Sequence, residues 1–151
     1  MIKEVAHIGL TVSDMDQSIE FYQKVLGLDF KGEILMEGPE TDRLFGAENT
    51  KARVAYLNGS DELIAPPVEL IQFLNCDYLP AKNDLRRLSI SELCFRVEDI
   101  DAVYERLLEH GVECLSEPQN FDFTKDGFGK SKAIYFKDPD GIILELMEYL
   151  D

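Results

Sequence analysis

Ten residues, His7-Ile-Gly-Leu-Thr-Val-Ser-Asp14-Met-Asp16, return further along the chain as Glu92-Leu-Cys-Phe-Arg-Val-Glu-Asp99-Ile-Asp101. The alignment needs no gap, and the apolar positions and both aspartates match at a constant offset of 85 residues. Later in each half, Val68-Glu69-Leu70 matches Leu144-Glu145-Leu146. A repeat of this kind predicts that one structural unit is present twice.

Each half has the pattern of a strand, a helix and three further strands. The opening strands are predicted over residues 5–12 and 90–97, where apolar and polar residues alternate. A helix is predicted after each opening strand, because apolar residues recur there at steps of three and four. An aspartate suited to the N-cap precedes each helix, and Gly27 and Gly111 mark the C-terminal ends. The remaining strands are predicted at residues 29–36, 52–57 and 68–74, and then at 112–116, 132–136 and 142–149.

This order of elements predicts an α+β fold, in which two tandem βαβββ modules form a cup-shaped mixed sheet with the helices on the outside. We expect a single domain over residues 1–151, with module one at about 1–75, a linker at about 75–88 and module two at about 89–151. The cysteines Cys76, Cys94 and Cys114 are widely spaced and are predicted to be reduced core residues.

The charge balance argues against two classes of partner. Thirty acidic and fifteen basic residues give a formal net charge of −15, which repels phosphate backbones and anionic lipids. Nucleic acid and membranes are therefore not expected as partners. The sequence has no apolar run of membrane-spanning length and no signal-peptide pattern at Met1 to His7, so we expect a cytoplasmic protein.

Strand parity places several polar residues on the face of each sheet that carries no helix. If Leu10 and Val12 face the helix of the first half, His7 faces away from it, because side chains alternate along a strand. By the same alternation Glu92, Cys94 and Arg96 face away from the helix of the second half. Glu69 and Glu145 can face the same side from the closing strands. The prediction is one metal site with ligands His7, Glu69, Glu92 and Glu145.

One imidazole and three carboxylates favour a hard divalent ion such as Mn²⁺, Mg²⁺ or Fe²⁺, while Zn²⁺ and Ni²⁺ stay open. The alternative is a structural role for His7. Against it, carboxylates that share a sheet face are costly to bury without a cation or a proton.

Several motifs resemble the vicinal oxygen chelate superfamily, which includes glyoxalase I, methylmalonyl-CoA epimerase, extradiol dioxygenases and the fosfomycin and bleomycin resistance proteins. The resemblance rests on Ala6-His-Ile-Gly-Leu-Thr-Val-Ser-Asp-Met-Asp16, Ser18-Ile-Glu-Phe-Tyr22, Leu26-Gly-Leu28 and Lys132-Ala-Ile-Tyr-Phe-Lys-Asp-Pro-Asp-Gly-Ile-Ile-Leu-Glu145. It implies that the first and last strands of each module supply ligands, which places His7, Glu69, Glu92 and Glu145 in those positions. Glu92 departs from the pattern, because the glyoxalase and dioxygenase branches usually have histidine there.

The resemblance implies a metal-dependent lyase or isomerase of glyoxalase I type. Such an enzyme acts on a small carbonyl compound or its thiol adduct through an enediolate, with Glu145 as the residue that moves the proton. One alternative is a non-catalytic drug- or metabolite-binding protein of the bleomycin resistance kind. Another is a ring-cleaving dioxygenase, which the missing second histidine argues against. The expected partners are a small-molecule substrate and a second copy of the chain in a homodimer.

Four further residues are candidates for substrate binding. Arg53 and Arg96 lie on predicted strands and suit an anionic part of the substrate, or else form ion pairs within an acidic protein. Phe121 and Phe123 lie in a glycine-containing stretch that is predicted to be either a hinged loop over the cup or part of the core edge. The segments 37–51 and 119–131 are expected to be loops that determine specificity.

Overall fold

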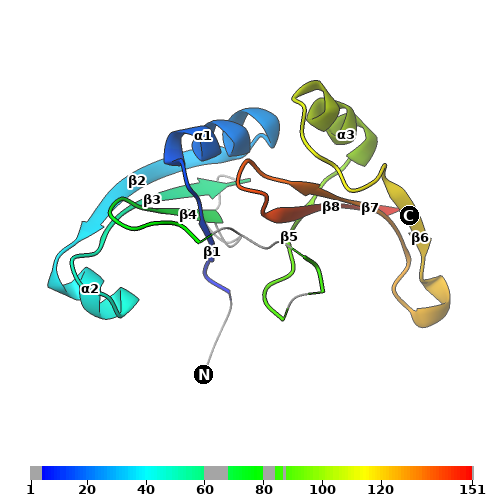
Figure 1. The fold of residues 1–151 in the computed structure, drawn as a ribbon. Coiled ribbons are helices and arrows are strands. Elements are labelled where there is room, and N and C mark those ends of the chain that lie inside the picture. The colour runs from blue at the N-terminus through cyan, green and yellow to red at the C-terminus, as the bar shows by residue number, and fades with distance from the viewer. Residues whose placement is uncertain (1–4, 60–67, 80–83, 87, 151) are drawn as a thin grey trace. The chain divides into compact units, whose positions relative to one another are not determined.

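The computed structural model describes residues 5–59, 68–79, 84–86 and 88–150. The chain divides into two compact units, Met1–Leu79 and Pro80–Asp151. Each unit contains one four-stranded sheet of mixed direction, and the helix that follows its first strand lies on one face of that sheet (Figure 1). The predicted α+β class and the tandem βαβββ modules are therefore confirmed.

The first unit has its strands in the order β1-β4-β3-β2, with β1 parallel to β4 and the other neighbours antiparallel. The helix α1 runs directly into one wider π-helical segment, η1. The elements in chain order are β1 (Ile8–Thr11), α1 (Met15–Glu20), η1 (Phe21–Val25), β2 (Asp29–Glu37), α2 (Pro39–Phe45), β3 (Lys51–Asn58) and β4 (Val68–Phe73).

The second unit repeats this topology, with strand order β5-β8-β7-β6 and β5 parallel to β8. No helix in the described part of the chain is long and apolar enough to cross a membrane. The elements are β5 (Leu93–Arg96), α3 (Ile100–Glu109), β6 (Gln119–Asp122), the short 3-10 helix η2 (Thr124–Asp126), β7 (Lys130–Lys137) and β8 (Ile143–Leu150).

Both α1 and α3 begin with the aspartate cap that the repeat predicts. The Asp14 carboxylate accepts a hydrogen bond from the backbone N–H of Gln17 at 3.0 Å, and Asp99 accepts one from Ala102 at 2.9 Å. Each cap satisfies a backbone donor that the first turn of a helix leaves without a partner.

A side chain from the closing strand of each sheet also holds the start of its helix. The backbone N–H of Met15 donates to the side-chain oxygen of Gln72 in β4, and that of Ile100 donates to Glu148 in β8. These contacts attach each helix to its own sheet, and they identify the sheet face that carries Gln72 or Glu148 as the helix side.

The core of each unit lies between its sheet and its helix. Many apolar side chains on the helix side of both sheets are fully buried, among them Leu57 and Leu70 in the first unit and Phe136 and Leu144 in the second. Because side chains alternate along a strand, the neighbours of these residues point to the other face, which carries the candidate site.

The predicted strand at residues 112–116 forms only in part. This segment pairs with β7 around one isolated bridge, between Cys114 and Phe136, with two flanking backbone hydrogen bonds. The strand that pairs with β7 over four residues is β6, which begins at Gln119. Pro118 lies between that segment and β6 and has no N–H to donate, so the pairing along β7 is interrupted there. The stretch with Phe121, interpreted as a hinged loop or core edge, thus contains a strand.

The segment 37–51, which the sequence predicts to be a loop, contains the helix α2. Pro39 occupies the first turn, where its missing N–H costs nothing, and Gly46 ends the helix with φ of 63°. Only Thr41 is buried in this helix, so its sequence lacks the repeating apolar pattern from which a helix is predicted.

The cysteines are free thiols, as predicted, but their expected place in the core is wrong. Cys76 and Cys94 are exposed, and Cys114 is half-buried. Cys94 lies on the helix-free face of the second sheet, beside one of the candidate ligands.

Candidate functional site

In the first unit, His7 and Glu69 lie together. His7 directly precedes β1, and Glu69 lies in β4 with Gly9 as its neighbour in the parallel ladder. The His7 Nε2 atom is 3.4 Å from Glu69 Oε2, and the two side chains are 49% and 12% exposed. An imidazole and a largely covered carboxylate thus share the face of the first sheet opposite α1, and Phe45 of α2 packs on Phe73 elsewhere on that face.

Tyr56 completes this group, and the sequence analysis missed it. It lies in β3 directly across from Glu69, and its hydroxyl is hydrogen-bonded to that carboxylate. Burial, together with the charge and hydrogen bond of Glu69, raises the pKa of Tyr56. At neutral pH the phenol therefore donates to Glu69 and helps fix its carboxylate.

In the second unit, Glu145 lies at the position of β8 that corresponds to Glu69. It is only 8% exposed, and its ladder neighbour in β5 is Cys94. Burial raises the pKa of Glu145, the nearby charge of Glu92 raises it further, and a hydrogen bond from the Cys94 thiol opposes this shift. Glu92 and Glu145 are thus close enough to interact on the same sheet face.

The two units hold these residues in the same backbone register. Gly9 pairs with Glu69, and Cys94 pairs with Glu145. The cross-strand partner of Glu145 is Tyr135, as that of Glu69 is Tyr56. The signal that could have found both tyrosines is this register, because a residue directly across an antiparallel pair lies on the same face.

Cys94 provides a test of this environment. Burial, followed by the hydrogen bond and charge of Glu145 and the charge of Glu92, raises the pKa of Cys94 to about 12. Since the thiolate is the reactive form, Cys94 should be alkylated slowly at neutral pH despite its exposure. In metal-free protein, Glu145→Gln should shift the alkylation profile to lower pH, because it removes a negative charge.

Iodoacetamide labelling read by mass spectrometry over a pH series measures this shift. The exposed Cys76 serves as the reference thiol in the same sample. An unchanged profile for Cys94 in the Glu145→Gln variant would show that the two side chains do not interact.

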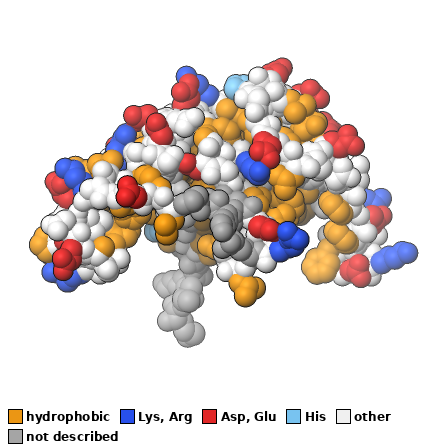
Figure 2. All heavy atoms as spheres, in the orientation of Figure 1, with side chains coloured by type: hydrophobic (Ala, Val, Ile, Leu, Met, Phe, Trp, Pro, Cys, Tyr) orange, Lys and Arg blue, Asp and Glu red, His pale blue; other side chains and the backbone are white. Residues whose placement is uncertain are grey.

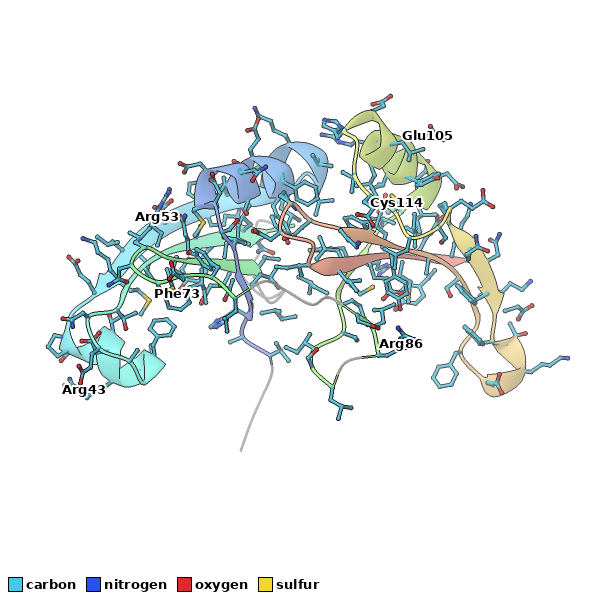
Figure 3. All side chains as sticks on the ribbon, viewed as in Figure 1. Arg43, Arg53, Phe73, Arg86, Glu105 and Cys114 are labelled. Carbon is cyan, nitrogen blue, oxygen red and sulfur yellow. The ribbon has the colours of Figure 1, made fainter. Side chains whose placement is uncertain are left out.

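The structure places Arg53 away from this group. Its guanidinium is 2.7 Å from Asp16 in α1 and 2.7 Å from Glu33 in β2, and these hydrogen bonds raise its pKa. Figure 3 shows Arg53 on the α1 side of the first sheet. In the second unit Lys132 makes the equivalent ion pair with Asp101 of α3. Of the two roles predicted for Arg53, the structure therefore shows ion pairing within the protein.

Arg96, by contrast, lies on the same sheet face as Glu145. It follows Cys94 by two residues along β5, and its guanidinium carbon is 5.5 Å from the centre of the Tyr149 ring. Phe121 in β6 pairs with Ser131 of β7, which pairs with Tyr149, so Phe121 shares this face. The Phe123 ring stacks on Phe121 with centroids 5.7 Å apart.

Each unit by itself brings together one pair of predicted ligands. Among the residues that the structure describes, no group of three or more His, Cys, Asp or Glu side chains has the arrangement of a metal site. The pairs are His7 with Glu69 and Glu92 with Glu145.

Comparison with known proteins identifies the family. The family model "Glyoxalase/Bleomycin resistance protein/Dioxygenase superfamily" matches residues 4–146. The chain is 30% identical to the metallothiol transferase FosB of Shouchella clausii, over 97% of this chain and 80% of that protein. It is 28% identical to a 2-epi-5-epi-valiolone epimerase of Actinomyces, over 95% of this chain and 78% of that protein.

Among solved structures, a glyoxalase family protein from Bacillus cereus has the same fold. The TM-score is 0.86 at 24% identity, and the match covers 100% of this chain and 97% of that one. Together with the family model, whose match spans nearly the whole chain, this likeness leads to one conclusion: the chain belongs to the glyoxalase/bleomycin resistance protein/dioxygenase superfamily, also called the vicinal oxygen chelate superfamily.

Proposed function

We propose that the protein is a metal-dependent enzyme in which His7, Glu69, Glu92 and Glu145 supply the ligands of one divalent cation. The observation that carries this proposal is the matched register of the two units. Each unit presents the residue before its first strand beside a glutamate of its last strand, on the sheet face opposite α1 in the first unit and opposite α3 in the second.

The chemistry of these residues fits a cation. Glu145 is buried beside a second carboxylate, and such a pair needs either a proton or a positive ion to offset its repulsion and its lost hydration. His7 adds a nitrogen donor next to Glu69. A set of one nitrogen and several carboxylate oxygens suits Mn²⁺, Fe²⁺, Mg²⁺ or Ni²⁺, and Zn²⁺ also accepts it.

We further propose that the reaction is a proton transfer next to a carbonyl group, as in a lyase or isomerase of glyoxalase I type. A bound cation would polarise the substrate carbonyl and make the neighbouring C–H acidic. Glu145 would take and return this proton through a carboxylate oxygen. In the metal-free protein, burial raises the pKa of this carboxyl group, so its carboxylate is a stronger base than that of an exposed glutamate. The relative named as an epimerase supports a reaction of this class.

A second candidate is the transfer of a thiol to a small substrate. It is favoured by the similarity to proteins named metallothiol transferase, of which one from Staphylococcus epidermidis is 32% identical over 97% of this chain. Both candidates need the same cation, and they differ in whether a thiol is consumed.

The test begins with elemental analysis of the protein as purified, and of protein stripped with a chelator and reloaded with single metals. We expect one divalent ion per chain. The reloaded protein is then incubated in D₂O with a panel of α-hydroxy and α-keto compounds, with and without a low-molecular-weight thiol.

NMR of the substrates separates the candidates. Deuterium entering next to the carbonyl supports the isomerase or lyase, whereas loss of free thiol supports transfer. A protein that binds no divalent ion contradicts the proposed function and favours a non-catalytic binding protein of the bleomycin resistance kind.

A further inference from the structure

One arginine of the second sheet differs from every other basic residue on the described strands. Each of the others has a carboxylate within 4.0 Å; they are Lys31, Lys51, Arg53, Lys130, Lys132 and Lys137. Arg96 has no ion pair or hydrogen bond from its guanidinium to another described residue. In a protein with a net charge of −15, such an arginine on an open sheet face indicates a place for a ligand anion.

The position of Arg96 is fixed by an aromatic ring rather than by a carboxylate. Its guanidinium lies over Tyr149 of β8, at 5.5 Å from the ring centroid. A cation–π contact orients the guanidinium and leaves its N–H donors available. Planar guanidinium groups bind carboxylates and phosphonates through two parallel hydrogen bonds.

Exposed aromatic rings continue across the same face. Tyr149 is 61% exposed, and across Ser131 lie Phe121 at 42% and its stacking partner Phe123 at 45%. Figure 2 shows hydrophobic side chains at the surface where β6 and η2 lie. Tyr149 and Phe121 are two strands apart, which corresponds to roughly 10 Å.

We propose that Arg96, Tyr149, Phe121 and Phe123 form a binding subsite for a flat, elongated organic anion. The acidic group pairs with Arg96, and the apolar body lies across β8 and β7 against the phenylalanines. This inference rests on the proposed function, because it assigns the substrate class of the same face. Arg96 lies two residues beyond Cys94 along β5, about 7 Å from the level of Glu145, so the subsite holds a part of the substrate remote from the reacting carbon.

The probe is biphenyl-4-carboxylate, which has the required length and charge. Its matched controls are biphenyl-4-carboxamide, which lacks the charge, and acetate, which lacks the rings. Binding is measured by isothermal titration or ligand-observed NMR in protein stripped of metal by a chelator. We expect the carboxylate to bind at least tenfold more tightly than either control.

Three variants separate the contributions. Arg96→Gln should weaken carboxylate binding at least tenfold and leave carboxamide binding unchanged, and Arg96→Lys should lose part of the affinity because lysine lacks the planar fork. Phe121→Ala should weaken both biphenyl compounds. The control Arg43→Gln removes the same charge from α2 in the first unit and should have no effect.

Equal binding of the carboxylate to wild type and Arg96→Gln, or an equal loss in Arg43→Gln, would overturn the subsite. Its failure is distinguishable from failure of the proposed function, because the probe binds without metal. His7→Ala should weaken metal binding and leave binding of the probe unchanged, whereas Arg96→Gln should weaken binding of the probe and leave metal binding unchanged.

Discussion

His7→Ala and Glu145→Gln should each weaken the binding of Mn²⁺ or Zn²⁺ by at least a hundredfold. Even the residues that only support a metal ligand are worth roughly 10- to 100-fold in affinity, and these two variants remove an imidazole and a carboxylate charge from the proposed site. The variants come from different units, so a loss in both would show that both halves contribute to one ion. Titration of chelator-stripped protein measures the effect.

A matched control is Glu105→Gln, which makes the same substitution on the exposed surface of α3 (Figure 3). It should bind metal as the wild type does. If only one of the two ligand variants loses the ion, the set of four ligands is wrong, and if neither does, the site is elsewhere.

Loss of metal in Glu145→Gln should not come from unfolding. The pKa of Glu145 is higher in the folded protein than in the unfolded chain, so its ionisation favours the unfolded state as pH rises above the usual carboxyl range. Glutamine removes that cost. The metal-free variant is therefore expected to melt at the same temperature as the metal-free wild type, or higher, at pH 7 by thermal circular dichroism.

The repeat made most of the fold predictable from the sequence. A constant offset of 85 residues matched the start of both units, and strand parity then assigned His7 and Glu92 to the face opposite the helix. The parity argument needs no knowledge of the packing, because it depends only on the alternation of side chains along a strand. The structure places His7 beside Glu69 and Glu92 near Glu145 for this reason.

The features that the sequence does not predict lie where the spacing between the two halves of the repeat changes. Tyr56 and Tyr135 are equivalent in the structure, but they are 79 residues apart, whereas Glu69 and Glu145 are 76 apart. An alignment at one fixed offset therefore cannot match the tyrosines. The strand β6 was missed for a related reason, because Pro118 interrupts the pairing along β7 and moves the strand beyond the apolar pattern.

Phe136→Ala should lower the free energy of unfolding by about 3 to 5 kcal/mol. Phe136 lies in β7 on the side that faces α3, it is 0% exposed, and its cross-strand neighbour Leu144 is also fully buried. Truncation removes a large apolar side chain and leaves a cavity that neighbours on the sheet cannot fill. Because natural domains are stable by only about 5 to 15 kcal/mol, this loss is a large part of the total.

Urea unfolding followed by circular dichroism measures the change, and the same substitution at Phe128 is the control. Phe128 lies between η2 and β7 and is 82% exposed, so Phe128→Ala should alter stability by no more than about 0.5 kcal/mol. The comparison isolates burial, since both variants lose identical atoms. A cost below about 1 kcal/mol for Phe136→Ala would mean that β7 does not pack on α3 as the structure has it, and the helix-free face that carries Glu145 would then be assigned to the wrong side of the sheet.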